Sequence, residues 1–309
     1  MKKDGTVVEV AIGDGKDDPC FVISDLLPHL AQEQSKRTLA DGIRGEELNV
    51  LVGSYPFKDD DESELVKLNV LDMLNKKYGI TESDFLSAEL EIVPALPVRE
   101  IGFDRSLIGG YGHDDRVCAY PELTALFDVT VPEKTAVAVF ADKEETGSDG
   151  VSGMNSTFFS YFANDLAGGQ GGQGYIALRN SKCLSADVNA AYDPNFPDVM
   201  EARNSSYINH GTVITKYTGA RGKSSTNDAS AEYMGEIRAL LDANGVCWQT
   251  GELGKIDLGG GGTVAKYLSY FGVTVVDLGV PVLSMHAPFE IISKYDLYMT
   301  YLACKAFLK

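Results

Sequence analysis

The feature that most constrains the fold is a series of apolar runs, each followed closely by a carboxylate or a histidine. Such runs are TAVAVFAD (135–142), CLSAD (183–187) and VPVLSMH (280–286), and amphipathic helical patterns separate them. Strands alternating with helices predict an α/β domain whose sheet is flanked by helices. The polar residues would then gather at one edge of the sheet, where open α/β folds place their ligands.

Four polar clusters follow this pattern: HDD (113–115), DKEE (142–145), SAD (185–187) and SMH (284–286). Carboxylates that converge at one sheet edge would repel one another unless a cation lay between them. Carboxylates and a histidine without a thiolate are a ligand set for zinc, manganese or cobalt. Taken singly, an aspartate after a strand more often caps a helix, and a Glu-Glu pair more often faces solvent. Only the joint pattern favours a metal site.

Composition excludes some classes of protein. The formal net charge of −18 argues against a nucleic-acid partner, which would require a basic surface. The five cysteines are scattered and form no CxxC pair, which favours a reducing compartment and argues against a zinc finger. No apolar stretch approaches eighteen residues. We therefore expect a soluble, cytoplasmic protein.

The two parts of the chain, residues 1–100 and 101–309, differ in the pattern of strands and helices that their sequences predict. In the first part we expect strands over 6–12, 47–56 and 87–95, a helix starting in 25–34, and a helix that the charged run 59–64 opens and Gly79 ends. Pro94 and Pro97 predict a boundary near residue 100. In the second part the apolar runs alternate with helical patterns over 117–129, 152–167, 228–245 and 294–308.

Several motifs together resemble the M18 family of metallo-aminopeptidases. They are GYGHDDR (110–116), DKEETGS (142–148), CLSADVNAAYDP (183–194) and GVPVLSMHAPFE (279–290). Two further segments, QTGELGKIDLGGGGT (249–263) and SKYDLYMTYLACKAF (293–307), resemble the bacterial aminopeptidase I branch. The resemblance covers essentially the whole chain. It implies a zinc-peptidase-like mixed sheet flanked by helices over 101–309 and a smaller α+β dimerisation domain over 1–100.

The resemblance also implies a site for two divalent metal ions, zinc first, with cobalt or manganese as alternatives. Asp114 would bridge the ions, Glu145 and His286 would bind one, and Asp187 would bind the other. Glu144 would act as the general base that takes a proton from water. Adjacent residues of an extended chain point in opposite directions, so the two glutamates can share this work only if the backbone turns there. Gly147 is consistent with such a turn.

Two further residues gain roles from the resemblance. Lys216 would contact substrate near the cleaved bond, and His29 would reach the site of a neighbouring subunit, although packing of its helix is an alternative. At two positions where the aspartyl branch has a histidine and a tyrosine, this chain has Ala190 and Lys223. We therefore expect a neutral or hydrophobic N-terminal residue in the substrate rather than an acidic one.

One expected ligand does not occur in the chain. The family takes a histidine for the second metal from an upstream HxDSP-like motif, so this sequence resembles a catalytic domain without its N-terminal part. The leading hypothesis is an aminopeptidase acting on peptides as a homo-oligomer built from dimers, up to a dodecamer. A truncated, catalytically silent structural subunit is the alternative, and a related metallohydrolase such as an amidohydrolase or carboxypeptidase is a third hypothesis.

Overall fold

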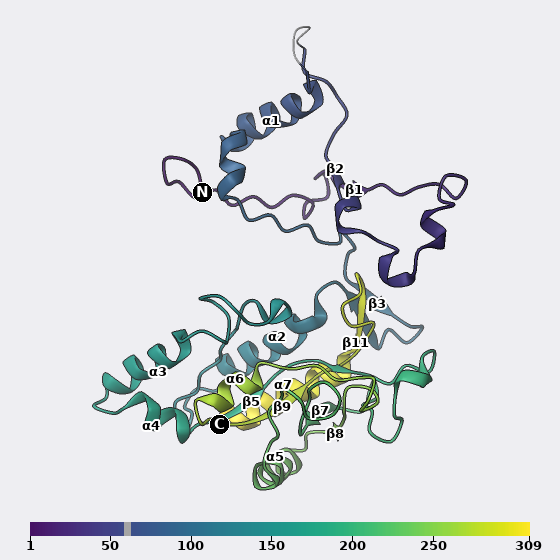
Figure 1. Ribbon diagram of the computed structural model, residues 1–309. Helices are drawn as coiled ribbons and strands as arrows, with labels where there is room; N and C mark the ends of the chain where they lie inside the picture. Colours follow the sequence, from purple (N-terminus) through teal and green to yellow (C-terminus); the bar gives the residue numbers. More distant parts are fainter. Residues whose placement is uncertain (59–62) are drawn as a thin grey trace. The chain divides into compact units, whose positions relative to one another are not determined.

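The computed structural model describes residues 1–58 and 63–309 and divides into two compact units, Met1–Ala95 and Leu96–Lys309 (Figure 1). The division falls close to the boundary at residue 100 that the prolines predict. None of the helices in the described ranges has the length and apolar character that crossing a bilayer requires.

The first unit contains little regular structure. Strand β1 (Val22–Ile23) pairs antiparallel with β2 (Val50–Leu51), and helix α1 (Leu65–Tyr78) ends at Gly79, whose φ of 66° is left-handed. The remaining elements are 3₁₀ turns: Gln34–Lys36, Leu39–Asp41, Gly45–Glu47 and Glu82–Ser87. Not one of the described residues of this unit is buried. The helix predicted before Gly79 is confirmed, but residues 59–62 of the charged run lie outside the described residues.

Other predictions for this unit are wrong. Residues 6–12 and 87–95 form no strand, the segment 25–34 does not start an α-helix, and only Val50 and Leu51 of the strand predicted over 47–56 are paired. Alternating apolar residues form a strand only where a neighbouring strand and a core accept them. In this unit no described side chain reaches a core.

The second unit holds two sheets. The first has the order β3-β4-β11-β10-β6, from Arg99–Ile101, Leu107–Gly110, Glu290–Ser293, Pro281–Leu283 and Asn189–Ala190. Its pairs are antiparallel except β10 with β6. The register places Glu290 opposite Gly110. The strand predicted at the start of 280–286 is therefore confirmed as β10.

The second sheet has the order β5-β9-β7-β8, from Lys182–Ser185, Thr274–Gly279, Thr212–Thr215 and Trp248–Thr250. β5 and β9 are parallel, as are β7 and β8, whereas β7 and β9 are antiparallel. The mixed sheets between helices confirm the predicted α/β class. β5 is an edge strand, so one of its sides has no ladder partner among the described strands.

Helices pack on these sheets (Figure 1). They are α2 (His113–Asp128), α3 (Phe158–Gly168), α4 (Gly174–Arg179), α5 (Ala231–Ala243), α6 (Ala265–Tyr270) and α7 (Lys294–Leu308). The side chains of Ser230 and Ser293 cap α5 and α7 by accepting from backbone amides of their first turns. The largest core joins α5 and α7 to the second sheet through fully buried Ile214, Ile237 and Leu278. The helices predicted from the apolar periodicity are confirmed.

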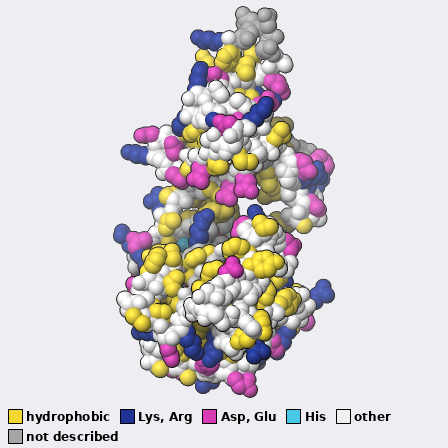
Figure 2. Space-filling view, turned by 90° about the vertical axis from the view of Figure 1, so that its left-hand side faces the viewer, with side chains coloured by type: hydrophobic (Ala, Val, Ile, Leu, Met, Phe, Trp, Pro, Cys, Tyr) yellow, Lys and Arg dark blue, Asp and Glu magenta, His cyan; other side chains and the backbone are white. Residues whose placement is uncertain are grey.

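The strand predicted over 135–142 is wrong. The segment forms no strand in the described structure, and the side chain of Val139 is 41% exposed. This segment and β5 both line a cavity of about 1370 Å³ inside the second unit. The sequence of the segment suits a buried strand, but no neighbouring strand supplies the hydrogen bonds that would make it one. Exposed apolar side chains are also visible over the face of the second unit in the lower part of Figure 2.

Candidate metal site

Asp114 lies where strand β4 turns into helix α2. Gly112, with a φ of 73°, makes the turn, and Asp114 and Asp115 have non-helical backbone angles within the first turn of the helix. The Asp114 side chain is only 9% exposed. Its backbone amide donates to Glu290 Oε2 at 3.0 Å. The first turn of α2 is thereby tied to strand β11.

His286 lies in the loop between β10 and β11. Ser284 and His286 both have positive φ, 58° and 64°, which is uncommon for residues with a Cβ. The backbone amide of His286 donates to Glu290 Oε1 at 2.8 Å. The same carboxylate therefore holds the loop of His286 and the turn of Asp114.

Glu144 and Glu145 begin a 3₁₀ turn, Glu144–Thr146. Lys143 and Gly147 on either side have φ values of 65° and 104°, and the amide of Ser148 donates back to the carbonyl of Lys143 at 2.7 Å. The expected backbone turn at the glutamate pair is confirmed. Because of it, the two adjacent side chains need not point to opposite faces.

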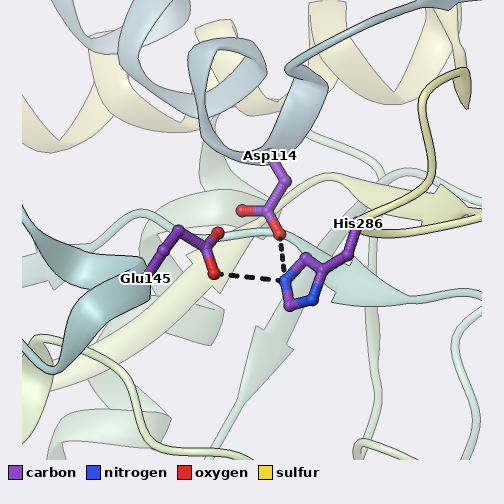
Figure 3. A group of neighbouring side chains, drawn as sticks. All are labelled: Asp114, Glu145 and His286. Carbon is purple, nitrogen blue, oxygen red and sulfur yellow. Dashed lines mark ion pairs between the residues drawn. The ribbon is translucent and has the colours of Figure 1, made fainter. Parts of the chain in front are cut away.

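Asp114, Glu145 and His286 converge from three segments that are far apart in sequence (Figure 3). His286 Nε2 lies 3.0 Å from Asp114 Oδ2 and 3.4 Å from Glu145 Oε2. A tetrahedral zinc ion with bonds of about 2.0–2.1 Å requires ligand atoms roughly 3.3 Å apart. The spacing and the donor types therefore fit a zinc ion.

Asp187 belongs to a second group, with Asp114 and Asp115, whose ligand atoms all lie within 4.8 Å of one another. It follows β5, and its backbone passes so close to Gly279 that a Cβ there would lie 1.8 Å from the Asp187 carbonyl oxygen. Asp115 was not expected among the ligands, although it stands in the HDD cluster. This second group contains carboxylates alone. Asp114 is common to both groups, as a bridging ligand would be.

Burial and mutual repulsion raise the pKa values of these carboxyl groups. Desolvation, followed by the charge of Glu145, raises the pKa of Asp114 to about 6. Desolvation raises the pKa of Asp115 and Asp187 more strongly, with Asp187 and Asp114 respectively as the next cause. The pKa of Glu144 is raised by burial first and by Glu145 second. A cation between these groups would relieve the repulsion.

The large cavity extends from this cluster across the second unit. Its lining includes Asp114, Glu144 and Asp187 at one end and the apolar side chains of Val137, Leu240 and Phe307 elsewhere. Glu122 also lines it, and desolvation raises the pKa of that carboxyl group to about 8. The carboxylates of the cluster therefore face a space with mainly apolar neighbours, where charged groups interact strongly.

The two predicted substrate-binding residues lie elsewhere. Lys216 directly follows β7 and forms an ion pair with Asp228. His29 is exposed in the first unit. Their roles remain predictions.

Sequence reasoning missed Glu290, which is 2% exposed and contacts two predicted ligands through their amides. The available signal was a single carboxylate in the apolar stretch FEIIS (289–293), four residues after His286. A carboxylate in a buried strand is costly unless it is paired, so it should have been given a partner.

Comparison with known proteins identifies the family. The family model described as "Aminopeptidase I zinc metalloprotease (M18)" matches residues 1–308. A protein of Clostridium acetobutylicum named "Probable M18 family aminopeptidase 1" is 51% identical over 312 residues, covering 100% of this chain and 67% of the relative. The chain thus spans about two thirds of that relative's length.

Solved structures agree. The crystal structure of an M18 aminopeptidase from Thermotoga maritima matches with a TM-score of 0.96 and 46% identity, over 100% of this chain and 69% of the other. That of aminopeptidase I from Clostridium acetobutylicum matches with a TM-score of 0.94 over 100% and 68%. A yeast structure described as the mApe1 dodecamer, 21% identical with a TM-score of 0.64 over 85% of this chain and 60% of the other, shows the fold alone. The chain therefore belongs to the M18 family of zinc metallo-aminopeptidases.

Proposed function

We propose that this chain releases N-terminal residues from peptides with two divalent metal ions and with Glu144 as the general base. The observation that carries the proposal is the convergence of Asp114, Glu145 and His286 at distances that suit zinc, with Glu144 adjacent in the sequence. The family supports peptide-bond hydrolysis at an N-terminus.

Asp114, Glu145 and His286 would hold the first ion, and Asp114 and Asp187 the second. Bound metal supplies Lewis acidity toward the scissile carbonyl and lowers the pKa of water. Asp115 adds a third carboxylate to the second group, where the family has a histidine. Carboxylates alone suit harder ions such as manganese better than zinc. We therefore expect zinc to bind the first group more tightly than the second.

Glu144 would take the proton of the attacking water. The 3₁₀ turn allows Glu145 to be used as a ligand while Glu144, which is half-buried and lines the cavity, stays free of the metal. Burial and the charge of Glu145 raise the pKa of Glu144. A base whose pKa lies closer to the working pH transfers protons more effectively.

The substrate would carry a neutral or hydrophobic N-terminal residue. The cavity beside the ligands is lined largely by apolar side chains, and Ala190 and Lys223 occupy positions where the aspartyl branch has other residues. Lys216 would contact the substrate near the cleaved bond. To do so it would break its ion pair with Asp228. His29 would act in the site of a neighbouring subunit.

A homo-oligomer built from dimers fits the first unit. None of its described residues is buried, and apolar side chains such as Leu39 and Leu86 are almost fully exposed. A second copy would cover such a surface. The dodecamer described for the yeast neighbour is the upper size that we propose. All five cysteines are free, which is consistent with a reducing compartment such as the cytoplasm.

A second candidate function is a catalytically silent subunit that contributes only its fold and its oligomer surface. The absence of a histidine from the second group within the described residues favours it. The two candidates differ in turnover after loading with zinc, cobalt or manganese.

The test is the variant Glu144→Gln, which keeps the volume of the side chain and removes the base. Hydrolysis of leucine or alanine anilides should fall about 10²–10⁴-fold, the usual contribution of general acid–base catalysis, while the bound metal content stays unchanged. Asp149→Asn, a nearby substitution outside the cluster, is the matched control and should keep full activity. Full activity of the Glu144→Gln chain would remove Glu144 from the mechanism.

A further inference from the structure

We propose that Glu290 is a positioning residue that sets the metal affinity of the first group by holding Asp114 and His286 in ligating orientation. The inference rests on the proposed metal site and adds a residue that contributes no ligand atom to it. Glu290 is 2% exposed, on strand β11, in a structure where most carboxylates face solvent.

The geometry is that of a tether with two ends. Glu290 Oε2 accepts from the amide of Asp114 at 3.0 Å, and Oε1 accepts from the amide of His286 at 2.8 Å. Asp114 and Glu290 are separated by 176 residues in sequence, so the tether joins segments that no local interaction could align. Each carboxylate oxygen holds one of the two candidate ligands, so one side chain fixes both of them within the frame that the pairing of β4 with β11 sets.

The backbone at the His286 end needs such support. His286 and Ser284 have left-handed φ, which residues with a Cβ rarely adopt. Residues in these conformations persist only where their surroundings hold them in place. A backbone amide that donates to a buried carboxylate forms a strong charge-assisted bond. Releasing either bond would let the candidate ligand that it holds turn away from the arrangement drawn in Figure 3.

The alternative is that Glu290 only stabilises the fold, and the chain offers a matched control for that alternative. Asp296 is also fully buried, and it accepts from the amides of Asn209 and Gly211 at 2.6 and 2.7 Å. Its partners lie in a loop that carries none of the candidate ligands. Both carboxylates tie two backbone amides, but only Glu290 ties the amides of ligands.

The experiment compares Glu290→Gln and Asp296→Asn in the full chain. Each change keeps the volume and replaces one accepting oxygen by an amide nitrogen, which cannot accept a backbone N–H. Zinc affinity is measured by competition with a chromophoric chelator. Hydrogen exchange is followed at the amides of Asp114 and His286 in the metal-free chain. Glu290→Asp, which keeps the charge but is too short to reach both amides, is the second variant if Glu290→Gln does not fold.

We expect the Glu290 variant to weaken zinc binding about 10–100-fold, the loss typical of an outer-shell partner, and to speed exchange at one or both amides. Asp296→Asn should lower the melting temperature and leave zinc affinity within twofold. Unchanged zinc affinity in the Glu290 variant, or an equal loss in Asp296→Asn, would overturn the inference. If the unchanged chain binds no zinc, the proposed function fails. The tether is then tested by hydrogen exchange alone, and unaltered exchange at the amides of Asp114 and His286 in Glu290→Gln would overturn it.

Discussion

The two halves of the candidate metal site are held in different ways. Asp114 and His286 are tied through their backbones to a buried carboxylate on the five-stranded sheet. Glu144 and Glu145 follow residues 134–141, which lie beside the cavity and have no strand partner in the described structure. Their turn is closed by its own hydrogen bonds and by the hydroxyl of Tyr267, which donates to the Gly147 carbonyl at 3.1 Å.

We infer from this difference that the half with Asp114 and His286 is ordered by the fold, whereas the half with Glu144 and Glu145 gains part of its order from what it binds. A ligand that is already in place binds metal without a further loss of conformational entropy, whereas a loosely held one loses entropy on binding.

The first prediction concerns the packed side of the second unit. Ile214 on β7 is fully buried in the core with α5 and α7. Ile214→Ala should therefore lower the free energy of unfolding by about 2–5 kcal/mol, because it removes buried methyl groups and leaves a cavity. Urea denaturation of the metal-free chain measures the change. A loss below about 1 kcal/mol would show that this side is not tightly packed.

The second prediction compares two ligands. His286→Ala should weaken zinc binding more than 100-fold, beyond the loss usual for an outer-shell partner. Glu145→Ala should weaken zinc binding by only about tenfold. Without Glu145 the metal no longer has to order the preceding segment, and the conformational entropy that is saved offsets part of the lost bond. Competition with a chelator measures the zinc affinity of both variants. The control is His210→Ala, because His210 is an exposed histidine in a loop. An equal or larger loss for Glu145→Ala would contradict the contrast.

The third prediction concerns pH. Burial raises the pKa of Asp277 on β9 to about 6, so the folded chain binds that proton more tightly than the unfolded chain does. The resulting destabilisation is present above pH 6 and absent below about pH 3.8. Asp277→Asn should therefore stabilise the chain by about 1–3 kcal/mol at pH 8 and by no more than about 0.5 kcal/mol at pH 4. Thermal melts at both pH values measure this. A gain that is the same at both would exclude the titration of Asp277 as its cause.

The fourth prediction concerns the open side. Val139 in the unpaired segment is 41% exposed. Val139→Ala should change the free energy of unfolding by less than about 0.5 kcal/mol, as is usual for exposed positions. The same urea titration as for Ile214→Ala applies. A loss approaching that of Ile214→Ala would mean that the segment is part of the core.

The sequence predicted much of the second unit, and the reason is physical. Helical periodicity over α5 and α7 reflects one buried face of each helix, and this pattern can be detected within the residues of the helix itself. The apolar run 135–142 favours a strand. A strand also needs a neighbouring strand to pair with, and the residues of the run do not determine whether one is present. The strands expected over 6–12 and 87–95 are absent for the same reason.

The convergence of Asp114, Glu145 and His286 as candidate ligands could be predicted from motifs, because each stands beside a recognisable local pattern. Glu290 could not be predicted in this way. Its partners lie on two separate segments, and only the pairing of β11 with β4 brings them together. Asp115 was missed because its neighbour Asp114 already accounted for the motif.

The most direct test of the proposed metal site is the anomalous diffraction of zinc-loaded crystals at the zinc absorption edge. We predict a peak about 2.0–2.2 Å from Asp114, Glu145 and His286, with the Glu144 carboxylate outside bonding distance. A zinc ion bound by Glu144, or a peak that none of these three ligands touches, would contradict the account.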